Sequence, residues 1–328
     1  MPVIRYRTFR NTDPPALAAA WNQCCTSRGA FPLRSTAPLE FAVFSKPYFD
    51  AKGLIVAEEE GQVVGFAHAG FGPDAAENSV NRDIGVICAL MVVPGKRRIG
   101  IGAELLRQAE SYLTNCGVVE IVAGQVPPIT PFYFGVYGNA NLPGFLKSDA
   151  LAAPFFEKHG YERWNTTLVF ERQLPQMEPV VDGRFVALRR RYDAQLVLGP
   201  QMQSWWQDCK FGPIEPAEFR LVDKLTTIPA ARCLLWEMHA LRNAGNPIAG
   251  LLELQVRPEM RRNGLARFML SMLMRYLQER YFRTVEIQCE EDNDACIRLL
   301  QGLGFENVDV GHSFRKSAGQ RLSPSSNG

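Results

Sequence analysis

The 328-residue sequence lacks the features that mark several special classes of protein. No uninterrupted apolar run reaches the ~18 residues of a membrane-spanning helix, and residues 1–5 do not begin the apolar core of a signal peptide. The net charge of only +2 gives no basic excess for a nucleic-acid or membrane partner. We therefore expect a cytoplasmic, globular protein that binds neither nucleic acid nor membrane.

Disulfide and metal-binding patterns are also missing from the sequence. The eight cysteines show no Cys-x-x-Cys or Cys/His ligand spacing, and the four histidines, His68, His159, His239 and His312, are dispersed. Scattered cysteines of this kind are typical of reduced thiols in a cytoplasm. The sequence predicts no metal site.

A short motif occurs twice, 164 residues apart. Arg97-Arg98-Ile99-Gly100-Ile101-Gly102 returns as Arg261-Arg262-Asn263-Gly264-Leu265-Ala266. Each copy follows an apolar run with a proline, and each opens a stretch in which apolar residues recur at helical spacing. The sequence thus predicts a strand, a turn and a helix twice, and its length allows two domains of about 150 residues.

This turn is suited to phosphate binding. The first amides of a helix have no partner within the helix and carry partial positive charge. Gly100 and Gly102 let a ligand approach the backbone, and the arginines add forked donors. The lysine of a P-loop is absent, and Leu105 stands where a dinucleotide-binding pattern requires its third glycine. A purely structural turn is the alternative interpretation.

Both copies resemble motif A of the GNAT superfamily of N-acetyltransferases. That motif is Gln/Arg-x-x-Gly-x-Gly/Ala at the end of a strand, and its amides hold the pyrophosphate of acetyl-CoA. The family's motif B is matched by Asn293, Cys296, Leu300 and Gly304-Phe305, and more loosely by Asp149, Ala152, Phe156 and Gly160-Tyr161. The chain therefore resembles a tandem GNAT protein over residues 3–170 and 183–315, an arrangement also seen in mycothiol synthase.

The resemblance implies an α/β (α+β) fold of two tandem GNAT-type domains, each a mixed, mostly antiparallel sheet flanked by helices. We place an N-terminal GNAT domain at 1–174, a C-terminal GNAT-like domain at 183–316 and a flexible tail at 317–328. Acetyl-CoA is the expected co-substrate, without a metal. The residues expected to bind it are Met91, Val92, Val93, Arg97, Arg98, Ile99, Gly100, Ile101, Gly102, Ala103, Gln255, Val256, Arg261, Arg262, Asn263, Gly264, Leu265, Ala266 and Asn293.

The first half contains an insertion. The two motif glycines are 60 residues apart in the first half, Gly100 to Gly160, but 40 apart in the second, Gly264 to Gly304. The roughly 20 extra residues fit best at about 127–147, a segment rich in proline, glycine and aromatic residues. Long loops of this kind are often ordered and functional. We expect a wall of the substrate pocket; packing between the domains is the alternative.

Apolar periodicity and turn signals predict the remaining elements. In the first half we expect strands at 3–9, 54–57, 63–67, 83–93 and 118–123, and helices at 13–25, with Asp13 as N-cap, at 38–49 and at 103–113. In the second half we expect strands at 184–191, 232–241, 248–256 and 285–289. Helices are expected there within 205–224, broken at Pro213 and Pro216, and at 264–281 and 293–303.

Acetyl transfer to an amine needs a base for the amine proton and an acid for the departing thiolate. The resemblance implies a motif B tyrosine as acid, but Phe156 and Leu300 occupy its register and neither donates a proton. A tyrosine of the insertion, Tyr133 or Tyr137, is our substitute; aromatic packing is the alternative for each. The carboxylates considered as bases, with solvated surface charge as the alternative, are Glu120 and Asp83 in the first half and Glu253 and Glu290 in the second.

The sequence predicts an acetyl-CoA-dependent N-acetyltransferase that acts on an amine of a small molecule or peptide, by direct attack in a ternary complex. We expect a monomer or homodimer and favour the first half as catalytic, because it has the fuller set of elements, the better Gly-x-Gly and the insertion. A non-catalytic acyl-CoA-binding or scaffold protein, with one or both domains inactive, is the main alternative. An enzyme for a longer acyl chain is another.

Overall fold

The structure of the chain, a computed structural model, describes residues 3–25, 28–175, 180, 182–238 and 247–318. Four sequence-based expectations lie wholly or partly outside these residues. They are His239, the end of the strand expected at 232–241, part of a linker that the sequence predicts at 171–181, whose first residues belong to a strand, and most of the tail at 317–328.

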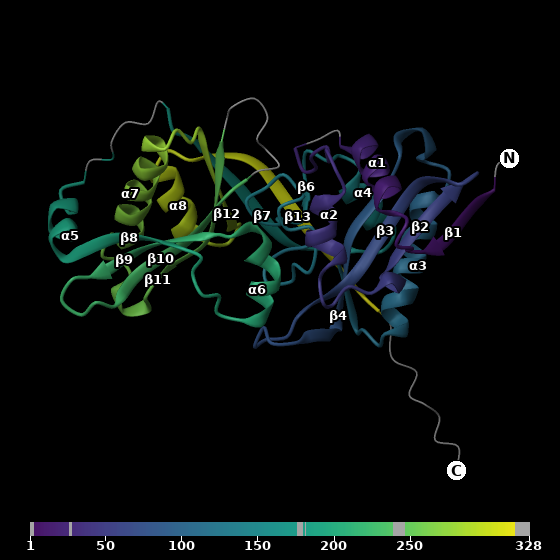
Figure 1. The fold of residues 1–328 in the computed structure, drawn as a ribbon, viewed down its shortest axis with the longest axis horizontal. Coiled ribbons are helices and arrows are strands. Elements are labelled where there is room, and N and C mark those ends of the chain that lie inside the picture. Colours follow the sequence, from purple (N-terminus) through teal and green to yellow (C-terminus); the bar gives the residue numbers. More distant parts are fainter. Residues whose placement is uncertain (1–2, 26–27, 176–179, 181, 239–246, 319–328) are drawn as a thin grey trace, which may run out of the picture.

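One continuous sheet runs along the whole molecule, with the first half of the chain at one end and the second half at the other (Figure 1). Its order is β1-β2-β3-β4-β5-β13-β7-β12-β11-β10-β9-β8, and β6 pairs with β13 at the side. The strands are β1 Ile4–Thr8, β2 Leu54–Glu59, β3 Gln62–Pro73, β4 Val80–Val92, β5 Glu120–Ala123, β6 Phe145–Leu146, β7 Glu162–Gln173, β8 Tyr192–Leu198, β9 Ala217–Asp223, β10 Pro229–Glu237, β11 Ile248–Val256, β12 Thr284–Glu290 and β13 Glu306–Ser317. The pairs β4/β5 and β11/β12 are parallel, and the other named strand pairs are antiparallel. The expected mixed, mostly antiparallel architecture is confirmed.

The last strands of the two halves are exchanged. β7, from the first half, pairs with β12 of the second half, and β13, from the second half, pairs with β5 of the first. β7 and β13 also pair with each other in the middle of the sheet. Each half therefore completes the sheet of the other, an arrangement that the sequence repeat does not predict.

Helices cover both faces of the sheet. They are α1 Pro14–Cys24, the short α2 Ala37–Leu39 with the π-helical turn η1 Glu40–Phe44, α3 Ile101–Asn115, α4 Ala152–Lys158, α5 Phe185–Arg191, α6 Trp205–Phe211, α7 Leu265–Glu279 and α8 Asp294–Gly302. The predicted apolar face of α3 is buried in full, with Leu105, Leu106, Ala109 and Leu113 against the sheet. α7, which follows the second glycine turn, packs in the same way in its own half.

Three local predictions are wrong or only partly correct. The segment expected as a strand at 184–191 is helix α5 with Arg184 as its N-cap. Phe185 packs against Phe268 of α7, with ring centroids 5.2 Å apart, and the strand begins only at Tyr192. Asp13 is the N-cap residue of α1 as expected, but its side chain makes no capping hydrogen bond and its carboxylate pairs with Arg7 instead, at 2.7 Å. The helix expected at 38–49 is reduced to α2 and η1.

The helical segment expected within 205–224 is only partly correct. α6 ends at Phe211, a single 3₁₀ turn occupies Gly212–Ile214, and the chain then extends as β9. The two prolines, Pro213 and Pro216, thus lie between a helix and a strand, because proline lacks the N–H that a continuing helix needs.

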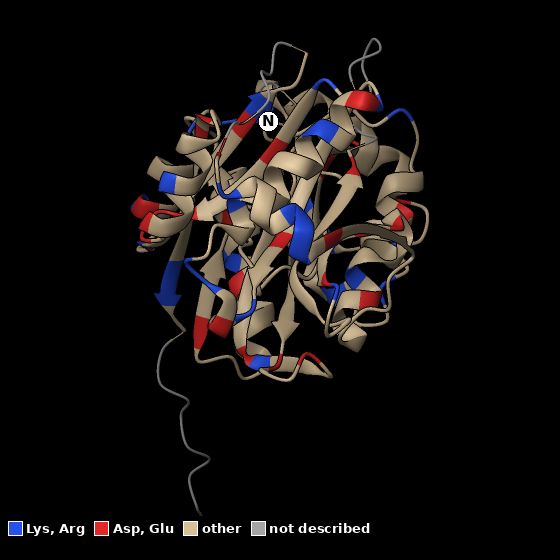
Figure 2. Ribbon diagram, turned by 90° about the vertical axis from the view of Figure 1, so that its left-hand side faces the viewer, with Lys and Arg blue, Asp and Glu red and all other residues tan. Residues whose placement is uncertain are grey.

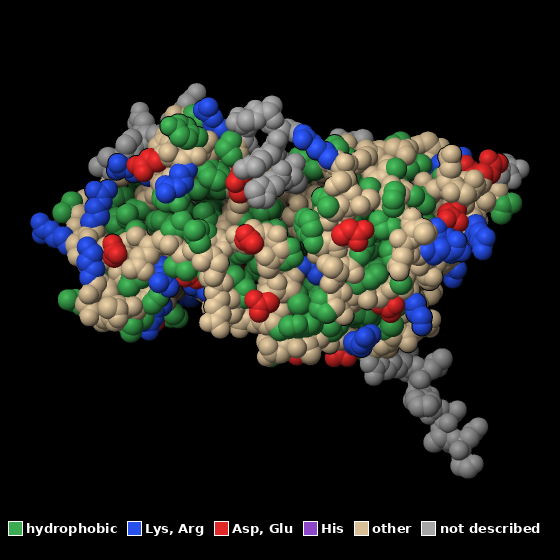
Figure 3. Space-filling model, viewed as in Figure 1, with side chains coloured by type: hydrophobic (Ala, Val, Ile, Leu, Met, Phe, Trp, Pro, Cys, Tyr) green, Lys and Arg blue, Asp and Glu red, His purple; other side chains and the backbone are tan. Residues whose placement is uncertain are grey.

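Charges of both signs are interspersed over the surface. Figure 2 shows lysine, arginine, aspartate and glutamate along most elements, and Figure 3 shows a face on which basic, acidic and apolar side chains alternate. No helix among the described residues is long and apolar enough to cross a membrane.

Candidate active site

The repeated motif folds into the same turn twice. The second arginine of each copy has a left-handed backbone, with φ of 64° at Arg98 and 63° at Arg262. The glycine before each helix is also left-handed, with φ of 94° at Gly100 and 80° at Gly264. Glycine adopts this conformation without the strain that a Cβ brings, so both turns depend on it.

The first arginine of each pair stabilises the turn. Arg97 Nε donates to the carbonyl of Val92 at 2.8 Å, and Arg261 Nε donates to the carbonyl of Val256 at 3.2 Å. This use leaves only the outer guanidinium nitrogens of Arg97 for a ligand. The sequence predicts that both Arg97 and Arg98 bind phosphate, whereas in the structure Arg97 already donates a hydrogen bond to the backbone.

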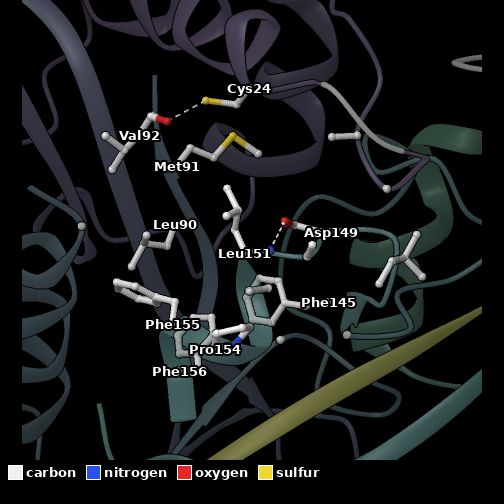
Figure 4. Close-up of a pocket in the computed structure, with 18 of the residues that line it drawn as sticks. Cys24, Leu90, Met91, Val92, Phe145, Asp149, Leu151, Pro154, Phe155 and Phe156 are labelled. Carbon is white, nitrogen blue, oxygen red and sulfur yellow. Dashed lines mark hydrogen bonds between the residues drawn. The ribbon is translucent and has the colours of Figure 1, made fainter. Parts of the chain in front are cut away.

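A cavity of about 660 Å³ opens where β4 and β5 separate. The two strands pair only as far as Ile87 and Ala123, and β4 then diverges toward the glycine turn. Figure 4 shows apolar and aromatic side chains around the space, with the Cys24 thiol bonded to the carbonyl of Val92. The lining includes Leu90, Met91 and Val92 of β4, Arg97 and Arg98, Gly100, Gly102 and Ala103 of the turn, and Phe155 and Phe156 of α4.

Seven of the ten residues predicted to bind acetyl-CoA in the first half therefore line the cavity: Met91, Val92, Arg97, Arg98, Gly100, Gly102 and Ala103. The other three do not. Val93 and Ile101 are buried in the core, and Ile99 is 65% exposed to solvent. Side chains alternate between the cleft, the core and solvent along this turn, which a contiguous motif does not reveal.

The two motif glycines of the first half have different roles. A Cβ on Gly100 would meet no atom within 4 Å, so this position is open. A Cβ on Gly102 would lie 3.3 Å from the ring of Phe155, so this glycine lets α4 pack closely on α3. The first helical hydrogen bond runs from the amide of Glu104 to Gly100 O at 3.1 Å, leaving the amides of residues 101–103 without a helical acceptor.

The second copy of the motif contributes nothing to the cavity lining. The predicted residues concerned are Gln255, Val256, Arg261, Arg262, Asn263, Gly264, Leu265, Ala266 and Asn293. Asn293 caps α8 by accepting a hydrogen bond from the amide of Cys296 at 3.1 Å. The guanidinium of Arg184 lies 3.6 Å from the place of a Cβ on Gly264. The N-cap residue of α5 thus lies beside the turn.

The insertion both lines the cavity and packs between the halves. Tyr137, Asn139 and residues 142–146 line the cavity. Phe134, Ala140 and Leu142 form a second core with residues of the second half, namely Phe211, Leu234, Trp236, Met238 and Leu252. In the second half, the insertion covers the face of the sheet that lies opposite α7. Leu235 and Leu251, which alternate along their strands with residues of this core, belong instead to the core that contains α7.

Of the two candidate acids, only Tyr137 reaches the cavity. Its hydroxyl donates to the carbonyl of Cys88 at 3.2 Å, and burial raises its pKa, so the hydroxyl stays protonated at neutral pH. Tyr133 lies in the core, where its hydroxyl is 3.0 Å from His68 Nδ1 and burial raises its pKa far above the ordinary value. Burial lowers the pKa of His68 to about 3, so this imidazole is neutral.

The candidate bases do not line the cavity. Glu120 begins β5 and pairs with Ser317, at the opposite end of the strand from the cavity. Asp83 precedes the paired part of β4, where its carbonyl accepts from the amide of Val119. In the second half, Glu290 ends β12 as an exposed residue.

Glu253 is the most distinctive of the carboxylates. It has φ of 50° at an irregularity in the β10/β11 pairing, and its side chain contacts Arg232 at 3.3 Å and Gln207 at 3.1 Å. Burial raises its pKa, the direction expected of a carboxyl removed from water. Its location assigns it to the second half, away from the cavity.

Sequence analysis missed six polar residues of the cavity as functional candidates: Cys24, Gln125, Asn139, Asp149, Lys158 and His159. Asp149 accepts a hydrogen bond from the amide of Leu151 at 3.1 Å, and Cys24 donates to Val92 O at 3.5 Å. Asn139 belongs to the insertion. Of these residues, Asp149 is the one that the sequence could have indicated, because it stands in the register of motif B. Among the described residues, no group of His, Cys, Asp or Glu is placed to hold a metal ion.

The cavity thus lies where a mixed sheet splits beside a glycine turn. The acetyltransferase (GNAT) family profile matches residues 19–133 and 199–305, one stretch in each half. The chain belongs to this family and is an N-acetyltransferase, as the resemblance of its motifs implies.

Individual relatives have the same tandem arrangement or fold. The chain is 26% identical over 247 residues to a mycothiol acetyltransferase of Geodermatophilus obscurus, covering 70% of this chain and 73% of that protein. A tandem GNAT protein from the clavulanic acid biosynthesis pathway superposes with a TM-score of 0.70 at 17% identity, over 97% of this chain and 100% of the other. A GCN5-related N-acetyltransferase from Sphaerobacter thermophilus gives 0.60 at 17%, over 99% and 98%. The predicted tandem GNAT fold is confirmed.

Proposed function

We propose that this N-acetyltransferase takes its acetyl group from acetyl-CoA, and that the first half alone carries out the transfer to an amine. The observation that supports the proposal is one continuous cavity that joins the glycine turn at Gly100 to the hydroxyl of Tyr137. A cavity of about 660 Å³ lies within the range usual for small-molecule sites.

The residues present fit a nucleotide-linked thioester. The open position at Gly100 and the amides of residues 101–103 suit a pyrophosphate at the start of α3. From Val92 to Cys88, four residues of β4 span about 13 Å, which gives room for an extended arm along the strand. The Tyr137 hydroxyl lies at Cys88, where such an arm would end.

The chemistry is a single displacement. When bound, acetyl-CoA supplies a thioester whose carbonyl carbon bonds to the amine nitrogen, while the carbon–sulfur bond breaks and the electron pair leaves with sulfur. The ammonium form first releases one proton to water; the neutral nitrogen then loses a second proton as the amide forms, and the thiolate gains one. Tyr137, protonated and within the cavity, is placed to donate the proton to the thiolate. Asp149 at the rim attracts the ammonium form of the amine.

The second half serves as a scaffold in this proposal. Arg184 lies beside its glycine turn, and the insertion packs on the sheet face opposite α7. In both places, a segment of this chain occupies the surface of the second half. This arrangement favours one part of the scaffold alternative from the sequence, namely that one domain is inactive. The inactive domain would be the second half.

The test is calorimetric titration of acetyl-CoA into wild type and two matched variants. Gly100→Ala and Gly264→Ala place a Cβ on a left-handed residue in equivalent turns, so each should destabilise its turn by about 1 kcal/mol. We expect one binding site per chain. Gly100→Ala should weaken acetyl-CoA affinity at least about tenfold, and Gly264→Ala should leave it unchanged.

Release of thiol from acetyl-CoA with a panel of primary amines then tests the transfer itself. Two sites per chain, or equal losses in the two variants, would contradict the assignment to the first half. Binding without thiol release with any amine would instead favour the non-catalytic acyl-CoA-binding alternative.

A further inference from the structure

The backbone carbonyl of Cys88 in β4 accepts hydrogen bonds from two side chains. The Tyr137 hydroxyl donates to it at 3.2 Å and Gln125 Nε2 donates to it at 3.4 Å, and all three residues line the cavity. Two consecutive residues of β3 pair with Ile87 and Ala89, and the pairing with β5 ends at Ile87. Cys88 is therefore the extra residue of a β-bulge, and side-chain donors pair its carbonyl.

The orientation of the Gln125 amide group follows from its other contact. Its Oε1 accepts a hydrogen bond from the backbone amide of Phe132 at 2.9 Å. Because a backbone amide only donates, the oxygen must face Phe132 and the nitrogen must face Cys88. Gln125 is 3% exposed, and its own carbonyl accepts from the amide of Gly144 at 2.7 Å. These contacts hold the side-chain N–H of Gln125 in place.

The two donors to Cys88 behave differently when a proton is transferred. A hydroxyl carries one hydrogen, so Tyr137 must leave the Cys88 carbonyl before it donates its proton to the thiolate. A buried carbonyl that loses its donor is destabilising. Gln125 gives up no proton in the reaction, so its N–H stays on the carbonyl throughout. The hydroxyl can then turn away without leaving the carbonyl unpaired.

Resting on the proposed acetyl transfer with Tyr137 as the acid, we infer that Gln125 is a positioning residue for that proton transfer. It keeps the Cys88 carbonyl paired while the Tyr137 hydroxyl turns to the thiolate. The O–H bond of Tyr137 breaks, and the thiolate supplies the electron pair of the new S–H bond. The proton that the amine nitrogen loses as the amide forms returns through water to Tyr137.

The kinetic test is a double-mutant cycle in the full chain, with thiol release from acetyl-CoA measured for the most active primary amine of the panel. Gln125→Met has a similar size and no donor. It should lower kcat about 10-fold, the effect of one unpaired buried carbonyl, and change the KM for acetyl-CoA by less than about 2-fold. In the Tyr137→Phe background its effect on kcat should be less than about 2-fold, because no hydroxyl then leaves the carbonyl.

Urea unfolding of the same four proteins tests the shared carbonyl without any turnover. Each single variant leaves Cys88 one donor, and the double variant leaves it none. The unfolding constant of the double variant should therefore exceed the product of the two single effects by about 10-fold. The lost contact between Gln125 and Phe132 is the same in both backgrounds and cancels in the cycle.

Two further variants complete the design. Gln108→Met removes an amide that donates to Glu104 on α3, outside the cavity lining, and should show no coupling to Tyr137→Phe in either measurement. Gln125→Glu keeps an oxygen for Phe132 and replaces the methionine variant if that variant has lost affinity for coenzyme A. It is measured at alkaline pH, where its carboxylate has no hydrogen to donate.

The outcomes separate this inference from the proposed function. With an active wild type, additive effects on stability or equal effects of Gln125→Met on kcat in both backgrounds would overturn the role of Gln125 and leave acetyl transfer intact. A kcat unchanged by Tyr137→Phe would reject Tyr137 as the acid and Gln125 as its positioning residue. Absence of thiol release in wild type with every amine would reject acetyl transfer, and the positioning role with it.

Discussion

Two tyrosines four residues apart in the insertion have opposite environments. Tyr137 lines the cavity and its hydroxyl bonds to the carbonyl of Cys88, whereas Tyr133 is 2% exposed and bonds to His68. Both have a raised pKa because of burial. The ability to donate a proton therefore does not distinguish them, but access to the cavity does.

We predict that Tyr137→Phe lowers kcat by about 10²-fold or more, the usual contribution of a positioned proton donor, with acetyl-CoA affinity unchanged. Tyr133→Phe is the matched control. It should leave kcat within about 2-fold but cost about 1–3 kcal/mol of unfolding free energy, because His68 Nδ1 loses its partner. Steady-state kinetics, calorimetry and urea unfolding measure these effects. A Tyr137→Phe enzyme with normal kcat would reject Tyr137 as the acid.

The environments of Tyr133 and Tyr137 cannot be predicted from the sequence, and the reason is physical. Helical and strand periodicity predicts which residues of α3 face the core, and Leu105 and Ala109 are buried as expected. The insertion lacks a period, so its side-chain directions depend on contacts with distant segments. Neither the burial of Tyr133 nor the placement of Asn139 follows from the sequence, although the presence of an insertion does.

At the scale of elements, the insertion connects the cavity to the second half. Its Ala140 accepts a hydrogen bond from Trp236 of β10, and Gln288 of β12 donates to the carbonyl of Asn141 at 3.1 Å. The second half has one helix, α6, between its first two strands, where the first half has α1 and α2. The insertion packs where this half has less helix of its own, so the two halves are not interchangeable.

We predict that Trp236→Phe weakens the enzyme through this connection. The change leaves the buried carbonyl of Ala140 without its donor, which should cost about 1–3 kcal/mol of unfolding free energy. Because Tyr137 and Asn139 of the same segment line the cavity, the KM for the amine should rise several-fold while acetyl-CoA affinity stays constant. Trp205→Phe, a 38% exposed tryptophan on the neighbouring α6, serves as control.

Kinetics with varied amine and calorimetry with acetyl-CoA separate the two effects. An equal loss of acetyl-CoA affinity would mean that Trp236 supports the whole cavity and not the insertion alone. Unchanged kinetics at both substrates would mean that the insertion keeps its position without this hydrogen bond.

The glycine turns illustrate which elements the sequence predicts well. The motif Arg-Arg-x-Gly gave both turns correctly, since a left-handed glycine before a helix is a local requirement. The exchange of β7 and β13 was not predicted, because each of these strands has an eligible partner in its own half. Local chemistry decides a turn, whereas the choice between equivalent strand partners depends on the assembled molecule.

At the scale of the whole molecule, a buried carboxyl lies where the halves meet. Glu286 on β12 is fully buried, and it accepts hydrogen bonds from the amide of Ala140 at 2.6 Å and from Arg28 at 3.1 Å. Arg28 also pairs with Glu171 on β7. Burial, opposed by these donors, raises the pKa of Glu286 to about 7. We therefore expect the contact between the halves to depend on pH.

The sign of this dependence follows from the direction of the shift. The unfolded carboxyl has a pKa of about 4.3, so the folded state holds the proton more tightly. The resulting stability is present below the unfolded pKa and is lost as the pH rises through about 7. Glu286→Gln keeps an oxygen for the amide of Ala140 and cannot ionise.

We predict that the unfolding free energy of wild type falls relative to that of Glu286→Gln between pH 5 and pH 8, by about 2.5 kcal/mol. Urea unfolding of both proteins across this range measures the difference. Lys46 and Lys210, whose pKa values burial lowers to about 8, and His68 titrate in both proteins and cancel in the comparison. A pH-independent difference would show that Glu286 stays ionised in the fold, with Arg28 sufficient to hold its charge between the halves.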